Sequence, residues 1–267
     1  MSLEKVEIGN INISRMIIGG NAFSGFSHLG PENDLRVKRY YTVSRIKETL
    51  KKAEELGINT FIGRADNHIM RMLMEYWDEG GTIQWIAQTC PEIENLQNCI
   101  QKAVSSGCKA CYIHGGQMDY YLANNCLEGV APAIETIKKA GIPAGIAGHN
   151  PEVFKWAEKN LELDFYMCCY YNSMNRDEKA EHVSGKPEWF REEDREIMVN
   201  LISSLGKPAI HYKVLAAGRI EPEKAFAFVA RHLREEDAVC LGFYTEDYPS
   251  MIQEDVELFK MSLADLK

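Results

Sequence analysis

The sequence predicts a closed (β/α)8 barrel, formed by a single domain over residues 1–267. Eight short apolar runs alternate with longer amphipathic segments, which is the order of elements in such a barrel. Several of the runs are apolar throughout, as is typical of parallel strands covered on both faces. Four joins between a helix and the next strand, LGIN, SGCK, AGIP and LGKP, share a glycine that ends the helix. A doubly wound open sheet is the alternative architecture.

The predicted strands are the apolar runs themselves, which are too short for ordinary helices. Most of them end in polar residues or glycine, where the chain returns to the surface. They cover residues 15–21, 59–65, 83–89, 110–116, 143–149, 164–172, 208–218 and 238–244.

The segments between the strands carry apolar residues at helical spacing. In SRIKETLKKAEELG (44–57), Ile46, Leu50 and Ala53 lie on one stripe. Ser44 is a candidate N-cap of this helix, and Gly57 ends it. The same pattern predicts helices over 93–107, 131–141, 151–160, 193–206, 221–234 and 247–261.

Composition excludes several classes of protein. Hydrophobic residues make up 45% of the chain, which excludes a fully disordered one. The net charge of −9 argues against a general nucleic-acid binder, because phosphate binding needs a basic face. The sequence contains no run of about 18 apolar residues, so it does not predict a membrane span. The eight cysteines lie mostly in apolar stretches, and no apolar leader opens the chain, so we expect reduced thiols in a cytoplasmic protein.

Polar side chains gather where the predicted strands end. In (β/α)8 barrels the functional site lies at the carboxyl ends of the strands and in the loops that follow them. This places candidate substrate-binding groups at Asn21, Arg64, Gln88, Tyr171 and Asn172. Such a ring of neutral hydrogen-bonding groups suits a polyhydroxylated substrate such as a sugar. Arg64 has a second interpretation, because a guanidinium in an apolar strand also pairs with an acid inside a barrel.

Two long segments follow predicted strands, at residues 25–44 and 175–194. Loops of about 20 residues in a compact domain are usually lids or binding loops. Both belong to the expected active face. They favour an enclosed site for a small-molecule substrate, and the sequence does not indicate an oligomeric state.

Three histidines fall at predicted strand ends: His114, His149 and His211. Neutral imidazoles that converge on a barrel mouth are suitable ligands for a divalent metal such as zinc or manganese. The alternative is that each histidine is a separate, hydrogen-bonded polar group near the rim. His114 is in addition a candidate acid or base near neutral pH.

Lys213 and Asp66 are the other catalytic candidates. Lys213 lies two residues after His211, so in a strand both side chains point to the same face. If that face is the interior, Lys213 is paired with an acid or has a depressed pKa suited to a Schiff base. The alternative is a solvated lysine beyond the strand end. Asp66 follows the second strand and is a candidate acid or base, or a further metal ligand.

Several segments resemble the aldo-keto reductase superfamily. They are ISRMIIGGNAFSG at the first strand, AEELGINTF (53–61), YYNSMNR (170–176), YKVLAAGRI (212–220) and LGFYTEDYPSMIQED (241–255). The resemblance covers nearly the whole chain and implies the same barrel. It also implies a site built from Asp, Tyr, Lys and His around a nicotinamide, and His114 in YIHGG matches the histidine.

The other three family residues are replaced. Ile62 stands where the resemblance places Asp, Asn67 stands where it places Tyr, and Gln88 or Thr89 stands where it places Lys. Proton donation to a carbonyl by the family's chemistry therefore has no agent. Glu246 and Asp247 in the last loop would repel the adenosine phosphate of NADPH, so we do not expect this cofactor.

These observations lead to three alternative functions. The first is an enzyme that acts on a small polar carbonyl or sugar-like substrate by proton transfer, elimination or hydrolysis, as a lyase, isomerase or hydrolase. In this hypothesis His114 is the acid or base, with or without the assistance of a metal held by the histidines. The second is a divergent NAD(P)H-dependent reductase. The third is a non-catalytic barrel that binds a metabolite.

Overall fold

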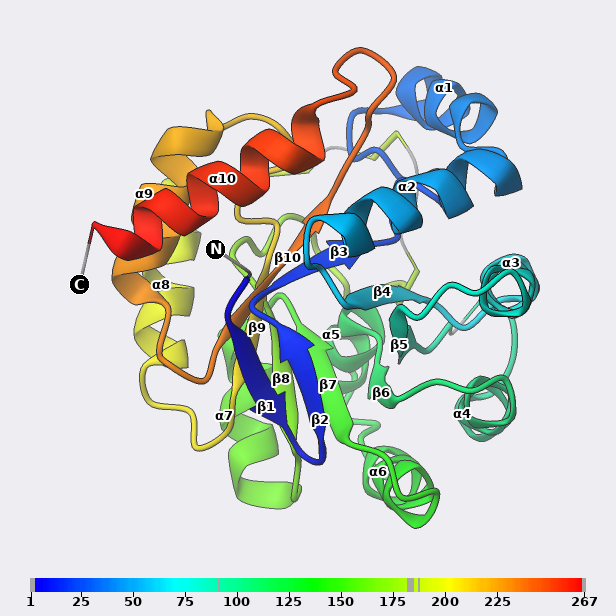
Figure 1. The fold of residues 1–267 in the computed structure, drawn as a ribbon. Helices are drawn as coiled ribbons and strands as arrows, with labels where there is room; N and C mark the ends of the chain where they lie inside the picture. Colours follow the sequence, from blue (N-terminus) through cyan, green and yellow to red (C-terminus); the bar gives the residue numbers. More distant parts are fainter. Residues whose placement is uncertain (1–2, 91, 182–184, 187, 266–267) are drawn as a thin grey trace.

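The computed structural model describes residues 3–90, 92–181, 185–186 and 188–265. Its centre is a closed barrel of eight parallel strands, in which β10 pairs with β3 and each strand from β3 to β9 pairs with the next (Figure 1). The predicted fold class is therefore confirmed. The strands are β3 (Met16–Gly19), β4 (Thr60–Arg64), β5 (Gln84–Gln88), β6 (Ala110–Ile113), β7 (Ala144–Gly148), β8 (Phe165–Cys169), β9 (Ala209–Tyr212) and β10 (Ala238–Gly242).

The helices surround the barrel. They are α1 (Pro31–Tyr40), α2 (Val43–Glu55), α3 (Asn67–Asp78), α4 (Leu96–Ser105), α5 (Gly115–Ala123), α6 (Val130–Lys139), α7 (Pro151–Asn160), α8 (Glu192–Ile202), α9 (Pro222–His232) and α10 (Met251–Ala264). The sequence did not predict α1, α3 or α5. The N-cap of α2 is Thr42, whose hydroxyl accepts from the Arg45 N–H, and Ser44 lies inside the helix.

The amino-terminal end of the barrel is closed by a hairpin that the sequence did not predict. Strands β1 (Lys5–Ile8) and β2 (Ile11–Ser14) pair antiparallel and lie across the barrel in Figure 1. Val6, Ile8 and Ile13 pack in one buried cluster with barrel residues such as Ile17 and Phe165. This apolar plug leaves the carboxyl ends of the strands as the polar end of the barrel.

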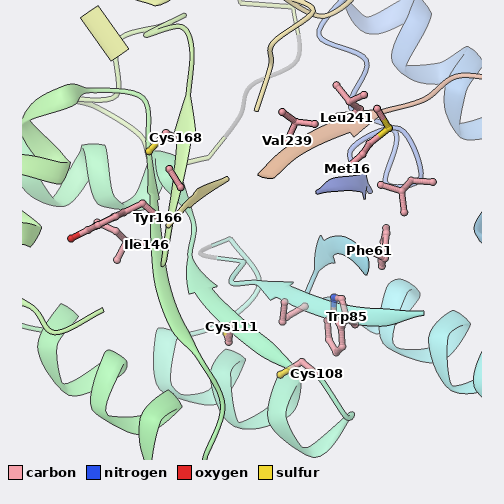
Figure 2. Close-up of a cluster of buried hydrophobic side chains, with 14 of the residues drawn as sticks. Met16, Phe61, Trp85, Cys108, Cys111, Ile146, Tyr166, Cys168, Val239 and Leu241 are labelled. Carbon is pink, nitrogen blue, oxygen red and sulfur yellow. The ribbon is translucent and has the colours of Figure 1, made fainter. Parts of the chain in front are cut away.

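A second and larger core lies between the barrel wall and the helices. Figure 2 shows part of it, including Phe61 and Trp85 on the neighbouring strands β4 and β5. The Trp85 indole donates a hydrogen bond to the Gly63 carbonyl at 3.1 Å, so its polar edge is satisfied inside the core. All eight cysteines are free thiols, and seven are buried. Within the described ranges, the helices are too short or too polar to cross a membrane.

Candidate functional site

Alternation along the strands selects the side chains that face the upper end of the barrel. Ile62, Ile86 and Tyr112 belong to the interior cluster, and Tyr212 packs against it. Side chains two residues apart in a strand share a face. Arg64 and Gln88, the last residues of β4 and β5, therefore also point inward. The Tyr112 hydroxyl donates to the Gln88 side-chain oxygen at 2.9 Å. Polar side chains therefore enter the barrel at the carboxyl ends of β4, β5 and β6.

An aspartate, a histidine and a tyrosine meet at this mouth. His149 follows β7, and its Nδ1 lies 2.6 Å from an Asp119 carboxylate oxygen on α5. The same carboxylate accepts the backbone N–H groups of His149 and Asn150 at 3.1 Å. A carboxylate only accepts, so Nδ1 carries the proton and Nε2 has a free lone pair. The Tyr212 hydroxyl at the end of β9 lies 3.4 Å from that Nε2.

Burial sets the protonation states of these groups. Burial lowers the pKa of His149 below its ordinary 6.5, although Asp119 opposes this, and the positive charges of Arg176 and Lys213 lower it further. Burial also raises the pKa of Tyr212 well above 10. At neutral pH the site therefore holds a neutral imidazole, which can accept a proton, beside a protonated phenol, which can donate a hydrogen bond.

A chain of side chains connects the loops above the mouth. The Lys213 ammonium lies 3.2 Å from one Glu188 oxygen, and the other Glu188 oxygen lies 2.8 Å from His28 Nδ1. Asn21 contacts His28 Nε2 at 3.2 Å. Burial alone would raise the pKa of Glu188, but the hydrogen bond from His28 and the charge of Lys213 lower it. This network links the segments that follow β3, β8 and β9.

The two predicted lid segments both contribute to this network. The segment 25–44 carries His28 and, contrary to the expectation of a loop throughout, also forms α1 and the start of α2. The segment 175–194 carries Glu188 and leads into α8. Residues 182–184 and 187 of this segment lie outside the described residues.

His114 and Arg176 lie beside each other at the start of α5. His114 is the N-cap residue of α5. A Cβ atom placed on Gly116 would be 3.0 Å from His114 Cε1 and 3.2 Å from Arg176 Cζ. Arg176 is only 6% exposed, and it donates to the carbonyls of Ala180 and Glu181 at 3.3 and 2.8 Å. The mouth therefore contains a buried guanidinium close to the candidate acid–base residue His114.

The three-histidine metal site is not formed. His211 faces outward into the wall, because β9 alternates and Tyr212 takes the inward position. Its Nε2 lies 3.3 Å from Asp237 and its Nδ1 lies 2.9 Å from the Tyr170 hydroxyl, with no exposed surface. Among the described residues, no group of three His, Cys, Asp or Glu is placed to hold a metal ion.

Lys213 does not share the face of His211, contrary to the prediction from their spacing. The strand ends at Tyr212, and Lys213 has a φ of 58°, a left-handed conformation that breaks the alternation. The side chain turns to the mouth and pairs with Glu188, as described above. Lys213 is therefore paired with an acid, which is one of the alternatives that the sequence left open.

Arg64 and Asp66 form an ion pair. Arg64 Nε lies 3.1 Å from Asp66, and the guanidinium also contacts Glu92. Asp66 caps α3, because its other oxygen accepts the Ile69 N–H at 2.9 Å. Both groups have structural partners, yet both line a hollow of about 410 Å³ together with Phe23, Ser24, Phe26, Lys38, Tyr41 and His68.

The remaining candidates lie at different depths. Tyr171 is buried against the Phe190 ring, with centroids 5.2 Å apart, and Asn172 is exposed with its backbone N–H directed to Asp194. Gln88 lies inside the barrel, and exposed Asn21 contacts His28. The structure thus brings Gln88, Asn21, His114, His149 and Lys213 to the mouth region but not His211 or Asn172.

Sequence reasoning missed Asp119, Arg176 and Tyr212. Asp119 lies in GGQMDYY, where the run predicted as strand 110–116 in fact ends at Ile113 and a helix begins. Alternation along β9 would have identified Tyr212 as an inward-facing residue if the end of the strand had been predicted correctly. No signal in the sequence pairs Asp119 with His149, which lies 30 residues away.

Comparisons with known proteins agree with this architecture. No family model matches the chain, and no curated protein matches it. A solved structure assigned as an aldo-keto reductase from Pseudomonas aeruginosa has a TM-score of 0.68 at 14% identity, covering 97% of this chain and 96% of that one. At this identity the likeness shows the (β/α)8-barrel fold that the sequence predicts.

Other barrels share the shape. A truncated 3-deoxy-D-arabino-heptulosonate 7-phosphate synthase from Thermotoga maritima has a TM-score of 0.54 at 13% identity, covering 99% of this chain and 91% of that one. A protein described as QR15, an aldolase, has a TM-score of 0.51 at 14% identity, covering 84% and 91%. At these identities the likeness concerns the fold.

Proposed function

We propose that the chain is an enzyme that moves a proton to and from a carbon atom next to a carbonyl group in a small polar or sugar-like substrate. The Asp119–His149–Tyr212 cluster carries this proposal. It offers a base and a hydrogen-bond donor side by side in a buried barrel mouth. A lyase or isomerase reaction of this kind needs both groups.

The step balances within these residues and the substrate. His149 Nε2 takes the proton from carbon, and the electron pair of the broken C–H bond moves to the carbonyl oxygen. The Tyr212 hydroxyl donates a hydrogen bond to that oxygen, and Asp119 stabilises the imidazolium through Nδ1–H. Return of the proton to the same carbon restores the substrate. Isomerisation of a hydroxy carbonyl compound needs a second proton transfer: the hydroxyl proton on the first carbon moves through the Tyr212 hydroxyl to the former carbonyl oxygen, while the imidazolium of His149 protonates the neighbouring carbon.

His114 keeps a place in the proposal as a second acid–base group. The sequence assigned the principal role to this residue. The structure favours His149 because a carboxylate fixes its tautomer and a phenol faces its free nitrogen. His114 lies at the start of α5 beside Arg176, within the same mouth region.

We propose the step without a nicotinamide or a metal. Glu246 and Asp247 lie in the loop after β10, and both carboxylates pair with Arg36, so this loop does not offer free cations to an adenosine phosphate. The described residues supply no three-ligand group for a metal. The aldolase and synthase among the structural neighbours support non-redox chemistry on this barrel by analogy of fold.

Solvent exchange tests the proposal. Chelator-treated protein is incubated in D2O with dihydroxyacetone, glyceraldehyde, their phosphates and pyruvate, and deuterium at carbon is followed by NMR. We expect exchange into at least one compound and its loss in His149→Gln. NADPH oxidation with the same carbonyls would instead identify a reductase. Tight binding without exchange would identify a metabolite-binding barrel, and either result would overturn the proposal.

A further inference from the structure

We propose that the start of α5 and the Arg176 guanidinium form a subsite for the anionic group, a carboxylate or a phosphate, of the substrate. This inference names the substrate class and rests on the proposed function for the role of the subsite. Its binding residues are Gly115, Gly116 and Arg176. None of them takes part in the proton transfer described above.

The first turn of α5 presents bare backbone donors at the barrel mouth. The His114 carbonyl accepts from the N–H groups of Gln117 and Met118, and the His114 side chain makes no capping hydrogen bond. Within the described part of the chain, no acceptor is recorded for the N–H groups of Gly115 and Gly116. Such donors at the positive end of a helix are suited to an anion.

The two glycines bring this backbone close to both the guanidinium and the acid–base pair. A Cβ on Gly116 would lie 2.2 Å from the Ala180 carbonyl oxygen and 3.2 Å from Arg176 Cζ. A Cβ on Gly115 would lie 3.1 Å from His149 Cε1 and 3.2 Å from the Tyr212 hydroxyl. Only glycine permits these approaches, so the backbone at the start of α5 lies directly against Arg176, His149 and Tyr212.

Arg176 supplies an independent observation. Only 6% of the Arg176 surface is exposed. No carboxylate among the described residues lies within ion-pair distance of its guanidinium. Its Nε is buried without an acceptor in the same residues. The nearby acids are engaged, Asp119 with His149 and Glu188 with Lys213. A buried guanidinium without a counterion is costly, and a bound anion would offset that cost.

The placement defines the substrate class. A molecule whose anionic group rests on Gly115, Gly116 and Arg176 would have its carbonyl near His149 and Tyr212, because Gly115 lies against both of them. Small oxo acids and sugar phosphates meet this description, and neutral sugars do not. The charge-assisted bonds to Arg176 would orient the substrate and supply most of its affinity.

Thermal unfolding in the presence of simple anions tests the subsite without relying on turnover. The probes are inorganic phosphate and pyruvate at constant ionic strength, with glycerol as the neutral probe. The proteins are the native chain, Arg176→Gln, and Arg191→Gln as a matched control, since Arg191 is an exposed arginine of the adjoining segment. His149→Gln is included to separate binding from chemistry.

We expect at least one anion to raise the Tm of the native chain, Arg191→Gln and His149→Gln by about 3 °C at ten times its Kd, and glycerol to have no effect. Arg176→Gln should lose this shift, while its own Tm without anion equals or exceeds the native value, because a buried charge has been removed. Phosphate or pyruvate as the stabilising probe distinguishes the two kinds of anion.

An equal shift in Arg176→Gln and the native chain would overturn the subsite, as would no shift with either anion. If Arg176→Gln does not fold, Gly116→Ala replaces it, because its Cβ meets the Ala180 carbonyl and closes the same position. Deuterium exchange without an Arg176-dependent shift leaves the proposed function and removes the subsite. An Arg176-dependent shift without deuterium exchange supports the subsite and removes the proposed function.

Discussion

Two Asp–His–Tyr clusters lie on opposite faces of the same barrel wall. The inner cluster joins Asp119, His149 and Tyr212, with a 2.6 Å contact between the first two. The outer cluster joins Asp237, His211 and Tyr170, and its acid–imidazole contact measures 3.3 Å.

The clusters differ in their surroundings rather than in their residue types. Each histidine has one nitrogen beside its aspartate and the other beside its tyrosine, but the tyrosine contact measures 2.9 Å for His211 and 3.4 Å for His149. His211 also has no exposed surface. His149 shares the mouth with Lys213, Glu188 and the buried Arg176, the groups that we propose stabilise or orient a ligand. An Asp–His pair is therefore a candidate for catalysis only where a substrate can reach its free nitrogen, and elsewhere it stabilises the fold.

Replacement of His149 has the largest expected effect. In His149→Gln, the kcat/KM for deuterium exchange should fall by about 10²–10⁴-fold, because the base is removed. The folded structure should remain, since Asp119 keeps the backbone N–H groups of His149 and Asn150. NMR exchange rates and circular dichroism check the two statements. An unchanged rate would place the base elsewhere.

Replacement of His211 should act on stability instead. His211→Ala leaves Asp237 in a buried position with Arg234 as its remaining charged partner. We expect the free energy of unfolding to fall by about 3 kcal/mol. Urea unfolding measures this loss, while the exchange rate per folded molecule should stay within about threefold of the native rate. A larger fall in that rate would contradict the division between the clusters.

The Lys213–Glu188–His28 network above the mouth should have a smaller effect on activity than His149. Glu188→Gln weakens the contacts to Lys213 and His28, which join three loops. Loss of a charge-assisted hydrogen bond is worth about 1–2 kcal/mol, so we expect KM to rise about 5- to 30-fold with a smaller change in kcat. Glu193→Gln, an exposed carboxylate in the first turn of α8, is the matched control. Equal KM values in both variants would show that the link does not order the site.

The pH dependence should be the smallest effect near neutrality. Burial lowers the pKa of His149 below 6.5, so the neutral base is present down to that pH. The kcat/KM profile should have its acid limb below pH 6.5. The unfolded chain binds this proton more readily, so stability from His149 is present above pH 6.5 and is lost as the pH falls through the folded pKa. An acid limb above pH 7 would contradict the assignment.

The outer cluster should respond at lower pH. Burial opposes ionisation of Asp237, but hydrogen bonds from His211 and Arg234 lower its pKa to about 2. Its contribution to stability is present above about pH 3.8 and is lost as the pH falls through about 2. Urea unfolding of the native chain and Asp237→Asn between pH 2 and 6 separates this loss from that of His149.

The barrel was predictable because its strands are apolar on both faces and its helices are amphipathic. The hairpin β1–β2 was not, because its strands are four residues each and their alternating residues resemble an ordinary polar terminus. The histidines at the strand ends were found, but the face of each depends on where its strand ends. One residue of register separates the outward His211 from the inward Tyr212.

Asp119 and Arg176 required the structure for another reason. Asp119 belongs to a short helix opened by two glycines, and its contact with His149 joins neighbouring loops of the barrel. Arg176 lies in a charged segment whose composition suggests a solvated loop, yet it is buried. Periodicity in the sequence indicates which helices and strands form. Contacts between loops, such as those of Asp119 and Arg176, have no periodic pattern and so cannot be predicted in this way.

The direct test compares Asp119→Asn with Asp237→Asn by the rate of deuterium exchange per folded molecule. Both changes remove a carboxylate charge from an Asp–His–Tyr cluster and keep its shape. The account predicts a fall of about 10²-fold or more for Asp119→Asn, because the imidazolium loses its stabilising partner, and a native rate within about threefold for Asp237→Asn. A native rate in Asp119→Asn, or an equal loss in both variants, would contradict it.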